Sequence, residues 1–252
     1  MKQGDKLWTR DELILVIYLY CQLPFGKLDQ NTPAVKQLAE LLGRTPGAVS
    51  FKLNNFASFD PSLQERGIQG ARNASKLDRV IWNEFFENIE KNVSETSQVF
   101  QKLFPTSVTA TDDESYTIKE GEEAERLIKV RTNQGFFRRM ILASYNSRCC
   151  ITGIELPELL IASHIVTWKS DSANRLNPRN GICINALHDK AFEAGLITIT
   201  PDYLVKVSNK IKQSSTAVSS YFIKYDSQPM VLPGKFWPDP GLLQLHNARF
   251  QQ

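Results

Sequence analysis

Two short apolar runs and one amphipathic helix follow each other between Leu159 and Gly195, and this segment restricts the fold more than any other. Leu159 to Ile165 (LLIASHI) predicts a buried strand with a histidine near its end. A polar loop follows, then a second short strand from Ile182 to Ile184. The next helix, Leu187 to Ala194, is expected to stop at Gly195. The spacing therefore predicts two strands and a helix packed around one small site.

Three polar side chains occupy defined places in this segment. His164 lies at the end of the first strand, Asn180 precedes the second strand, and His188 lies near the start of the helix. A single histidine at a strand end is usually structural. The three groups together, on two strands and a helix, form a constellation that favours a functional site.

The sequence from about Arg148 to Thr200 closely resembles the HNH (ββα-metal) endonucleases found in restriction enzymes. The motifs ITG, ASHI, RLNPRNG and ALHDKAFEAGLI occur in the family's order and spacing. The resemblance implies phosphodiester hydrolysis with His164 as the general base, which is largely neutral at pH 7 and can accept a proton. It also implies that Asn180 ties the loop to the first strand and that His188 is a metal ligand.

The residue before the general base departs from the family pattern. Many relatives carry Asp or His there and use it to hold the metal, whereas this chain has Ser163. Either Ser163 acts through water, or a carboxylate such as Asp189 or Glu193 takes its place. The resemblance implies one divalent cation, and Mg²⁺ suits a site with few protein ligands best, with Mn²⁺ or another divalent ion as the alternative.

The cysteines do not predict a zinc site or a disulfide framework. Gly153 stands where a C-x₂-C pair would place its second cysteine, so no structural zinc is expected. Cys149, Cys150 and Cys183 are interpreted as core thiols of a reduced, cytoplasmic protein. His246 is interpreted as a surface or helix-packing histidine without a catalytic role.

The segment from Pro105 to Glu125 divides the chain into two predicted domains. It lacks apolar periodicity and gathers Ser, Thr, Asp, Glu and Gly, as solvated linkers do. We expect an α+β protein with a helical winged-helix-like domain at 1–104, an acidic linker at 105–125 and a ββα-metal nuclease domain at 126–252. The alternative is a long acidic surface loop within one domain.

The N-terminal half carries helical patterns. Asp11 to Tyr20 predicts one helix, Ala34 to Leu42 a second that starts at Pro33 and stops at Gly43, and Thr45 to about Phe56 a third. A helix, a short turn with Gly and a helix form the helix-turn-helix outline. On that outline the exposed face of the third helix, with Ser50, Lys52, Asn54 and Asn55, would enter a DNA groove, and the segment Glu65 to Lys76 would be a wing or loop. A small helical bundle without DNA contact is the alternative.

The basic excess of the chain lies in its C-terminal half. Residues 126–252 carry a formal charge of +8, although the whole chain carries only +3. Arg131 to Tyr145 predicts a helix with an apolar inner face and an arginine-bearing outer face, interpreted as either a phosphate clamp or a solvated surface. The candidate nucleic-acid contacts are Arg138, Arg139, Arg179 and Lys190, together with Lys52 and Asn54 of the N-terminal half.

Beyond the helix that ends at Gly195, the pattern predicts more strands. Leu196 to Thr200 and Tyr203 to Val207 alternate apolar and polar residues around a turn, which favours a hairpin. Phe222 to Tyr225 is expected to add another strand.

These observations predict a metal-dependent DNA endonuclease, a restriction enzyme, acting on double-stranded DNA. A requirement for a modified base stays open, because no aromatic cage can be identified from spacing. The alternatives are a non-catalytic DNA-binding regulator and a nuclease that acts on RNA or structured nucleic acid. A homodimer is expected because cutting both strands takes two sites. No run of about 18 apolar residues occurs, so no membrane span is expected.

Overall fold

A computed structural model describes residues 6–69, 75–103, 122–167 and 174–250. The chain forms two compact units, Met1–Phe137 and Arg138–Gln252. Most of the predicted acidic linker, and the middle of the predicted wing or loop, lie outside the described residues. None of the described helices is both long enough and apolar enough to cross a membrane.

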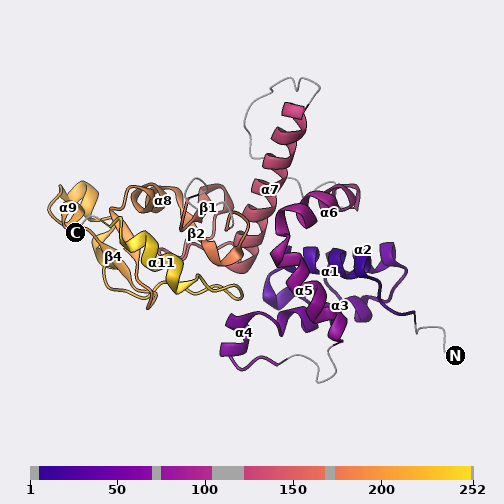
Figure 1. The fold of residues 1–252 in the computed structure, drawn as a ribbon. Coiled ribbons are helices and arrows are strands. Elements are labelled where there is room, and N and C mark those ends of the chain that lie inside the picture. Colours follow the sequence, from indigo (N-terminus) through magenta and orange to yellow (C-terminus); the bar gives the residue numbers. More distant parts are fainter. Residues whose placement is uncertain (1–5, 70–74, 104–121, 168–173, 251–252) are drawn as a thin grey trace. The chain divides into compact units, whose positions relative to one another are not determined.

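The first unit is helical (Figure 1). Its helices are α1 (Arg10–Gln22), α2 (Pro33–Leu42), α3 (Pro46–Ala57), α4 (Pro61–Glu65), α5 (Lys76–Glu87), α6 (Ile89–Leu103) and the first part of α7 (Glu122–Ser144), with a 3₁₀ turn at Phe25–Lys27. The three helices predicted for this half are confirmed as α1, α2 and α3, within two residues at each end. The described residues of this unit contain no β-strand, so they do not support the winged part of the predicted domain.

Local sequence explains where these helices begin and end. Thr9 and Glu12 form a capping box at the start of α1, and Pro33 occupies the first turn of α2. Gly43 ends α2 in the left-handed conformation, with φ of 60°. Thr45 accepts a hydrogen bond from Ala48 N at the start of α3. The helix α1 lies at the centre of the unit, since it contacts α2, α3, α5 and α6 and most of its apolar side chains are fully buried.

Two residues of the predicted DNA-binding face of α3 are buried, so the prediction is wrong for them. Lys52 is only 7% exposed, and its ammonium group lies 2.7 and 2.9 Å from the two carboxylate oxygens of Asp78. Asn55 is also buried and donates a hydrogen bond to Asp78. The buried carboxylate therefore holds both side chains inside the unit, where they satisfy its charge. Asn54 stays exposed and donates to Ser50 O within its own helix.

The second unit begins with the last turns of α7 and contains two small antiparallel sheets. Its elements are η3 (Pro157–Leu159), β1 (Leu160–His164), η4 (Pro178–Asn180), β2 (Gly181–Asn185), α8 (Ala186–Glu193), β3 (Ile197–Ile199), β4 (Val205–Val207), α9 (Asn209–Lys212), α10 (Thr216–Ser219), η5 (Ile223–Tyr225) and α11 (Pro240–Asn247). The strands β1 and β2 pair with each other, and α8 contacts both. This arrangement confirms the predicted order of two strands and a helix.

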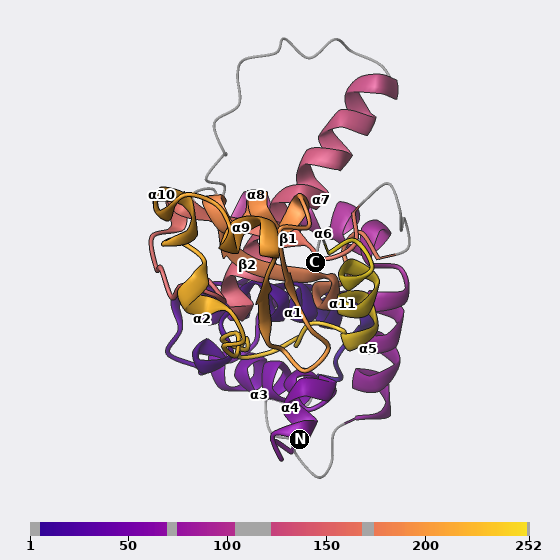
Figure 2. The same cartoon turned by 90° about the vertical axis from the view of Figure 1, so that its left-hand side faces the viewer.

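The hairpin predicted after Gly195 is also confirmed, as β3 paired with β4. Figure 2 shows α11 beside this hairpin, where it contacts β3. The strand predicted at Phe222 to Tyr225 is wrong, because that segment forms the 3₁₀ turn η5. The segment after it lies along β4 instead, where Ser227 N donates to Val205 O and Val205 N donates to Gln228 O.

Gly195 lets the C-terminal segment approach the end of α8. Its φ is +66°, and a Cβ atom added there would lie 2.5 Å from Arg249 O. We expect Gly195→Ala to lower the free energy of unfolding by about 2 kcal/mol or more, since a left-handed non-glycine residue costs about 1–2 kcal/mol before any clash. Gly153→Ala is the matched control, because Gly153 has φ of +76° but only an ordinary contact at 3.9 Å. Urea unfolding compares the two variants, and equal losses would contradict the close-approach argument.

Candidate active site

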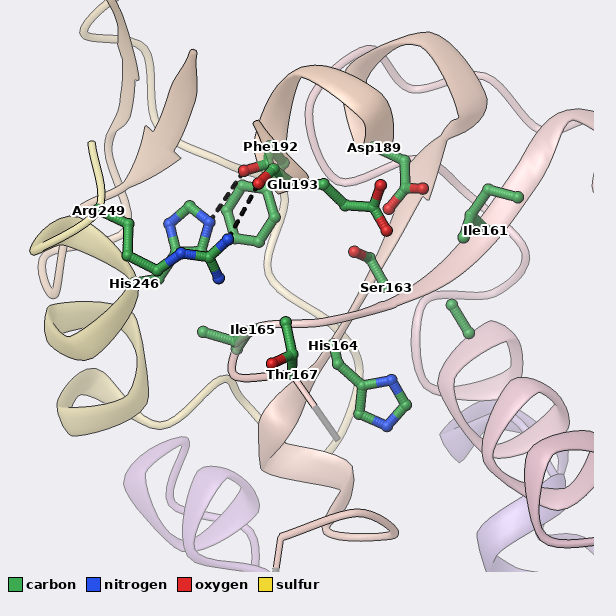
Figure 3. A pocket seen from close by; sticks show the side chains of 11 residues that line it. Ile161, Ser163, His164, Ile165, Thr167, Asp189, Phe192, Glu193, His246 and Arg249 are labelled. Carbon is green, nitrogen blue, oxygen red and sulfur yellow. Dashed lines mark hydrogen bonds between the residues drawn. The ribbon is translucent and has the colours of Figure 1, made fainter. Parts of the chain in front are cut away.

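His164 ends β1 and lines a cavity of about 240 Å³ in the second unit (Figure 3). Its Nε2 lies 2.9 Å from the backbone oxygen of Arg175. A carbonyl only accepts, so Nε2 carries the proton and a neutral ring keeps its lone pair on Nδ1. Burial lowers the pKa of His164 below its ordinary value of 6.5, although the Arg175 carbonyl opposes the shift. The ring is therefore neutral near pH 7, in the form that can take up a proton.

Asn180 holds the loop beside this histidine. It is fully buried, its Oδ1 accepts from Val166 N at 2.8 Å, and its Nδ2 donates to Val166 O and Asn174 O, each at 3.1 Å. The hydrogen bond to Asn174 O fixes the residue that precedes Arg175. The carbonyl of Arg175 in turn orients His164. Asn180 thus joins the end of β1 to the loop in the way the family resemblance implies.

Ser163 points to the opposite side of β1 from His164 (Figure 3). Its hydroxyl faces the carboxylates of Asp189 and Glu193, which lie one helical turn apart on α8, and all three side chains line the same cavity as His164. Burial raises the pKa of Asp189, while a hydrogen bond from Ser163 opposes this shift. The Oδ1 atom of Asp189 is buried and has no hydrogen-bond partner among the described residues. Two carboxylates and a hydroxyl therefore present oxygen atoms to one space.

His188 lies elsewhere in the unit. It is 4% exposed, its Nδ1 lies 3.1 Å from Asn185 Oδ1, and its ring packs against Phe222 and Tyr225 with centroids 4.7 and 5.5 Å away. Burial lowers its pKa to about 4. The described lining of the cavity includes Asp189 and Glu193 but not His188. The cavity lining therefore places Ser163 with the carboxylates that the sequence offered as the alternative, and His188 is not among the described lining residues.

The arginines predicted to bind nucleic acid are mostly engaged within the unit. Arg138 donates to Leu160 O at 2.7 Å and to Pro157 O at 3.1 Å, so it supports the start of β1. Arg179 forms an ion pair with Asp239 at 3.1 Å. Lys190 is well exposed and pairs with Glu193, and Arg139 is partly exposed. Of these four side chains, Lys190 is the most accessible to a substrate.

Two residues that line the cavity were assigned no role from the sequence. His246 is buried, stacks on Phe192 with centroids 3.6 Å apart, and lies with Nε2 3.0 Å from Phe192 O. Arg249 donates to Glu193 O at 3.1 Å. Both belong to the C-terminal segment, and nothing in their spacing indicates that they return to α8. The stacking contact confirms the helix-packing interpretation of His246.

The buried histidines predict acid sensitivity. His188 and His246 each have a pKa of about 4, well below the ordinary 6.5, mainly because of burial. The unfolded chain therefore binds more protons than the folded chain between these values, so the free energy of unfolding should fall as the pH drops from about 6.5 toward about 4. Urea unfolding at about pH 7 and about pH 5 measures this. Equal stability at both values would contradict the prediction.

The cysteines occupy the core, as the sequence predicted. Cys149, Cys150 and Cys183 are buried and unbonded to one another, and burial raises the pKa of Cys150 and Cys183 above the ordinary 9.0. Cys149 Sγ accepts hydrogen bonds from Asn185, the residue that caps α8. Cys149 thus helps to orient α8, and the raised pKa of Cys150 and Cys183 does not activate those two thiols as nucleophiles.

The family model for HNH endonucleases matches residues 149–200, the segment that contains β1, β2, α8 and β3. The chain therefore carries an HNH endonuclease domain. It is a nuclease, an enzyme that hydrolyses phosphodiester bonds, and its substrate is a nucleic acid. No curated protein matches the chain.

Proposed function

We propose that the protein is a metal-dependent endonuclease that cuts double-stranded DNA with His164 as its general base. The observation that carries this proposal is the hydrogen bond between His164 Nε2 and Arg175 O, which leaves the basic Nδ1 in a ring whose pKa is lowered. In this reaction His164 takes a proton from the attacking water as its oxygen bonds to phosphorus, and the bond from phosphorus to the 3′ oxygen breaks. Asn180 is the positioning residue, because it fixes the loop that carries Arg175.

The divalent cation that HNH nucleases generally use fits the carboxylate side of the cavity. Asp189, Glu193 and Ser163 offer hard oxygen donors, and the buried Oδ1 of Asp189 lacks a partner among the described residues. The described residues contain no cluster of three or more His, Cys, Asp or Glu side chains arranged for a metal. Mg²⁺ needs no such cage, since it commonly binds one or two carboxylates together with water and substrate phosphate. When bound there it would neutralise charge on the phosphate and on the departing oxygen.

We propose that Asp189, Glu193 and Ser163 bind the metal and that His188 does not. His188 contacts the helix-capping residue Asn185 and packs against the rings of Phe222 and Tyr225. These contacts support a packing role for His188. His188 as a metal ligand is the competing prediction, because its Nε2 is buried without a hydrogen-bond partner in the described part of the chain. Metal binding by matched variants separates the two ligand sets.

The biological setting that this activity fits is restriction of foreign DNA, in which one HNH site cuts one strand and a homodimer cuts both. The test is the conversion of supercoiled plasmid, unmodified and cytosine-modified, to nicked and linear forms with Mg²⁺, Mn²⁺ or EDTA. Metal-dependent cutting of duplex DNA that exceeds cutting of an RNA competitor supports the proposal. No cutting of either plasmid with either metal would replace it with a non-catalytic DNA-binding protein.

A further inference from the structure

We propose that Arg249 is a substrate-binding residue of this nuclease, whose guanidinium group holds a phosphate of the nucleic acid at the cavity lined by His164, Asp189 and Glu193. Arg249 lies outside the segment 149–200 that matches the HNH family, so the C-terminal segment would complete the site. The inference rests on the proposed function, because it takes this cavity as the place where the phosphate is cut.

The described lining of the cavity carries two carboxylates and one guanidinium group. Asp189 and Glu193 carry the acidic groups, and Arg249 is the one permanently charged cation among the described lining residues. A phosphate that enters beside these carboxylates is repelled by them, although Lys190, 3.0 Å from Glu193, offsets part of that charge. A guanidinium group matches phosphate well because its planar donors can bind two oxygens at once.

The fold holds Arg249 at this place by several independent contacts. The His246 ring stacks on Phe192 with an interplanar angle of 4°, which fixes α11 against α8. The absence of a side chain at Gly195 lets Arg249 O approach closely. The hydrogen bond from Arg249 Nη2 to Glu193 O then directs the side chain along the end of α8 (Figure 3).

The guanidinium group is available for a ligand. Arg249 is exposed and forms no ion pair with the described carboxylates, and a single hydrogen bond to a neutral carbonyl uses one of its five donor hydrogens. Arg138 and Arg179 differ, because the first donates to two backbone carbonyls and the second pairs with Asp239. Among the described arginines of this unit, Arg249 therefore combines a place in the cavity with an uncompensated charge.

The experiment compares Arg249→Gln and Arg249→Lys with Arg148→Gln in the full chain. Arg148 is the matched control because it is exposed, belongs to the same unit and pairs with Glu155 away from the cavity. We expect R249Q to lower kcat/KM for plasmid nicking about tenfold to a hundredfold, the range of one charge-assisted hydrogen-bond contact. In the His164→Ala background, R249Q should reduce the slope of log affinity against log salt by about 0.9, the contribution of one phosphate contact.

R249K should fall between R249Q and the wild-type protein, because lysine keeps the charge but not the planar donor pair. R148Q should match the wild-type protein in both assays. Values for R249Q that equal those of R148Q in both assays would overturn the inference, and thermal unfolding of each variant checks that the fold is kept. Should the wild-type protein cut no DNA, the proposed function fails by itself, and the salt slope still decides whether Arg249 binds phosphate.

Discussion

Replacing His164 by alanine is expected to abolish DNA cleavage, with a loss of about 10²–10⁴-fold in rate, the usual contribution of a positioned general base. DNA binding should change little, because the base acts on the attacking water in the transition state and not on the bound duplex. The measurement is single-turnover nicking of supercoiled plasmid, together with binding of a labelled duplex. Gln244→Ala, an exposed change on α11, is the control and should cut at the wild-type rate.

The pH profile gives an independent test of the same role. The neutral form of His164 is the base, and burial lowers its pKa below 6.5, so activity should rise with pH and level off before or near that value. In His164→Gly, added imidazole should restore part of the cleavage by supplying the missing base. Cleavage by His164→Ala at the wild-type rate would show that His164 is not the general base. The positioning role proposed for Asn180 would then also be wrong.

Replacing Asp189 by asparagine is expected to remove metal-dependent cleavage, with a loss of about a hundredfold or more, since a changed ligand affects both metal affinity and the charge near the phosphate. Asparagine keeps the size of the side chain and an oxygen that can accept from Ser163, so the packing of α8 should be retained. The direct readout is Mn²⁺ affinity measured by calorimetry, which does not depend on cleavage. Glu158→Gln, at an exposed carboxylate of the same unit, is the control.

The parallel variant His188→Asn distinguishes the two proposed ligand sets. If Asp189 and Glu193 hold the metal, His188→Asn loses stability because a buried ring that packs on Phe222 and Tyr225 is removed, while the folded protein keeps its Mn²⁺ affinity. Loss of affinity in His188→Asn with normal affinity in Asp189→Asn would assign the metal to the histidine instead.

Local sequence patterns predicted most of the elements around the site. The strand β1, the helix α8 and the hairpin β3–β4 follow from apolar alternation, and the ends of α2 and α8 follow from Gly43 and Gly195. The prediction of a strand at Phe222 to Tyr225 is wrong, because a short apolar run does not specify whether the segment pairs with another strand or forms a turn. Lys52 was assigned to a DNA-binding face because helical spacing does not reveal that Asp78, a residue 26 positions away, buries it.

The sequence by itself determined the HNH motifs, and with them the class of enzyme and the roles offered to His164 and Asn180. Only the tertiary structure decided which groups share the cavity. Strand alternation turns Ser163 away from His164 toward α8, and helical spacing brings Asp189 and Glu193 to the same face while His188 packs on Phe222. Arg249 reaches the cavity because the C-terminal segment folds back over Gly195, a contact between residues 54 positions apart that no local pattern encodes.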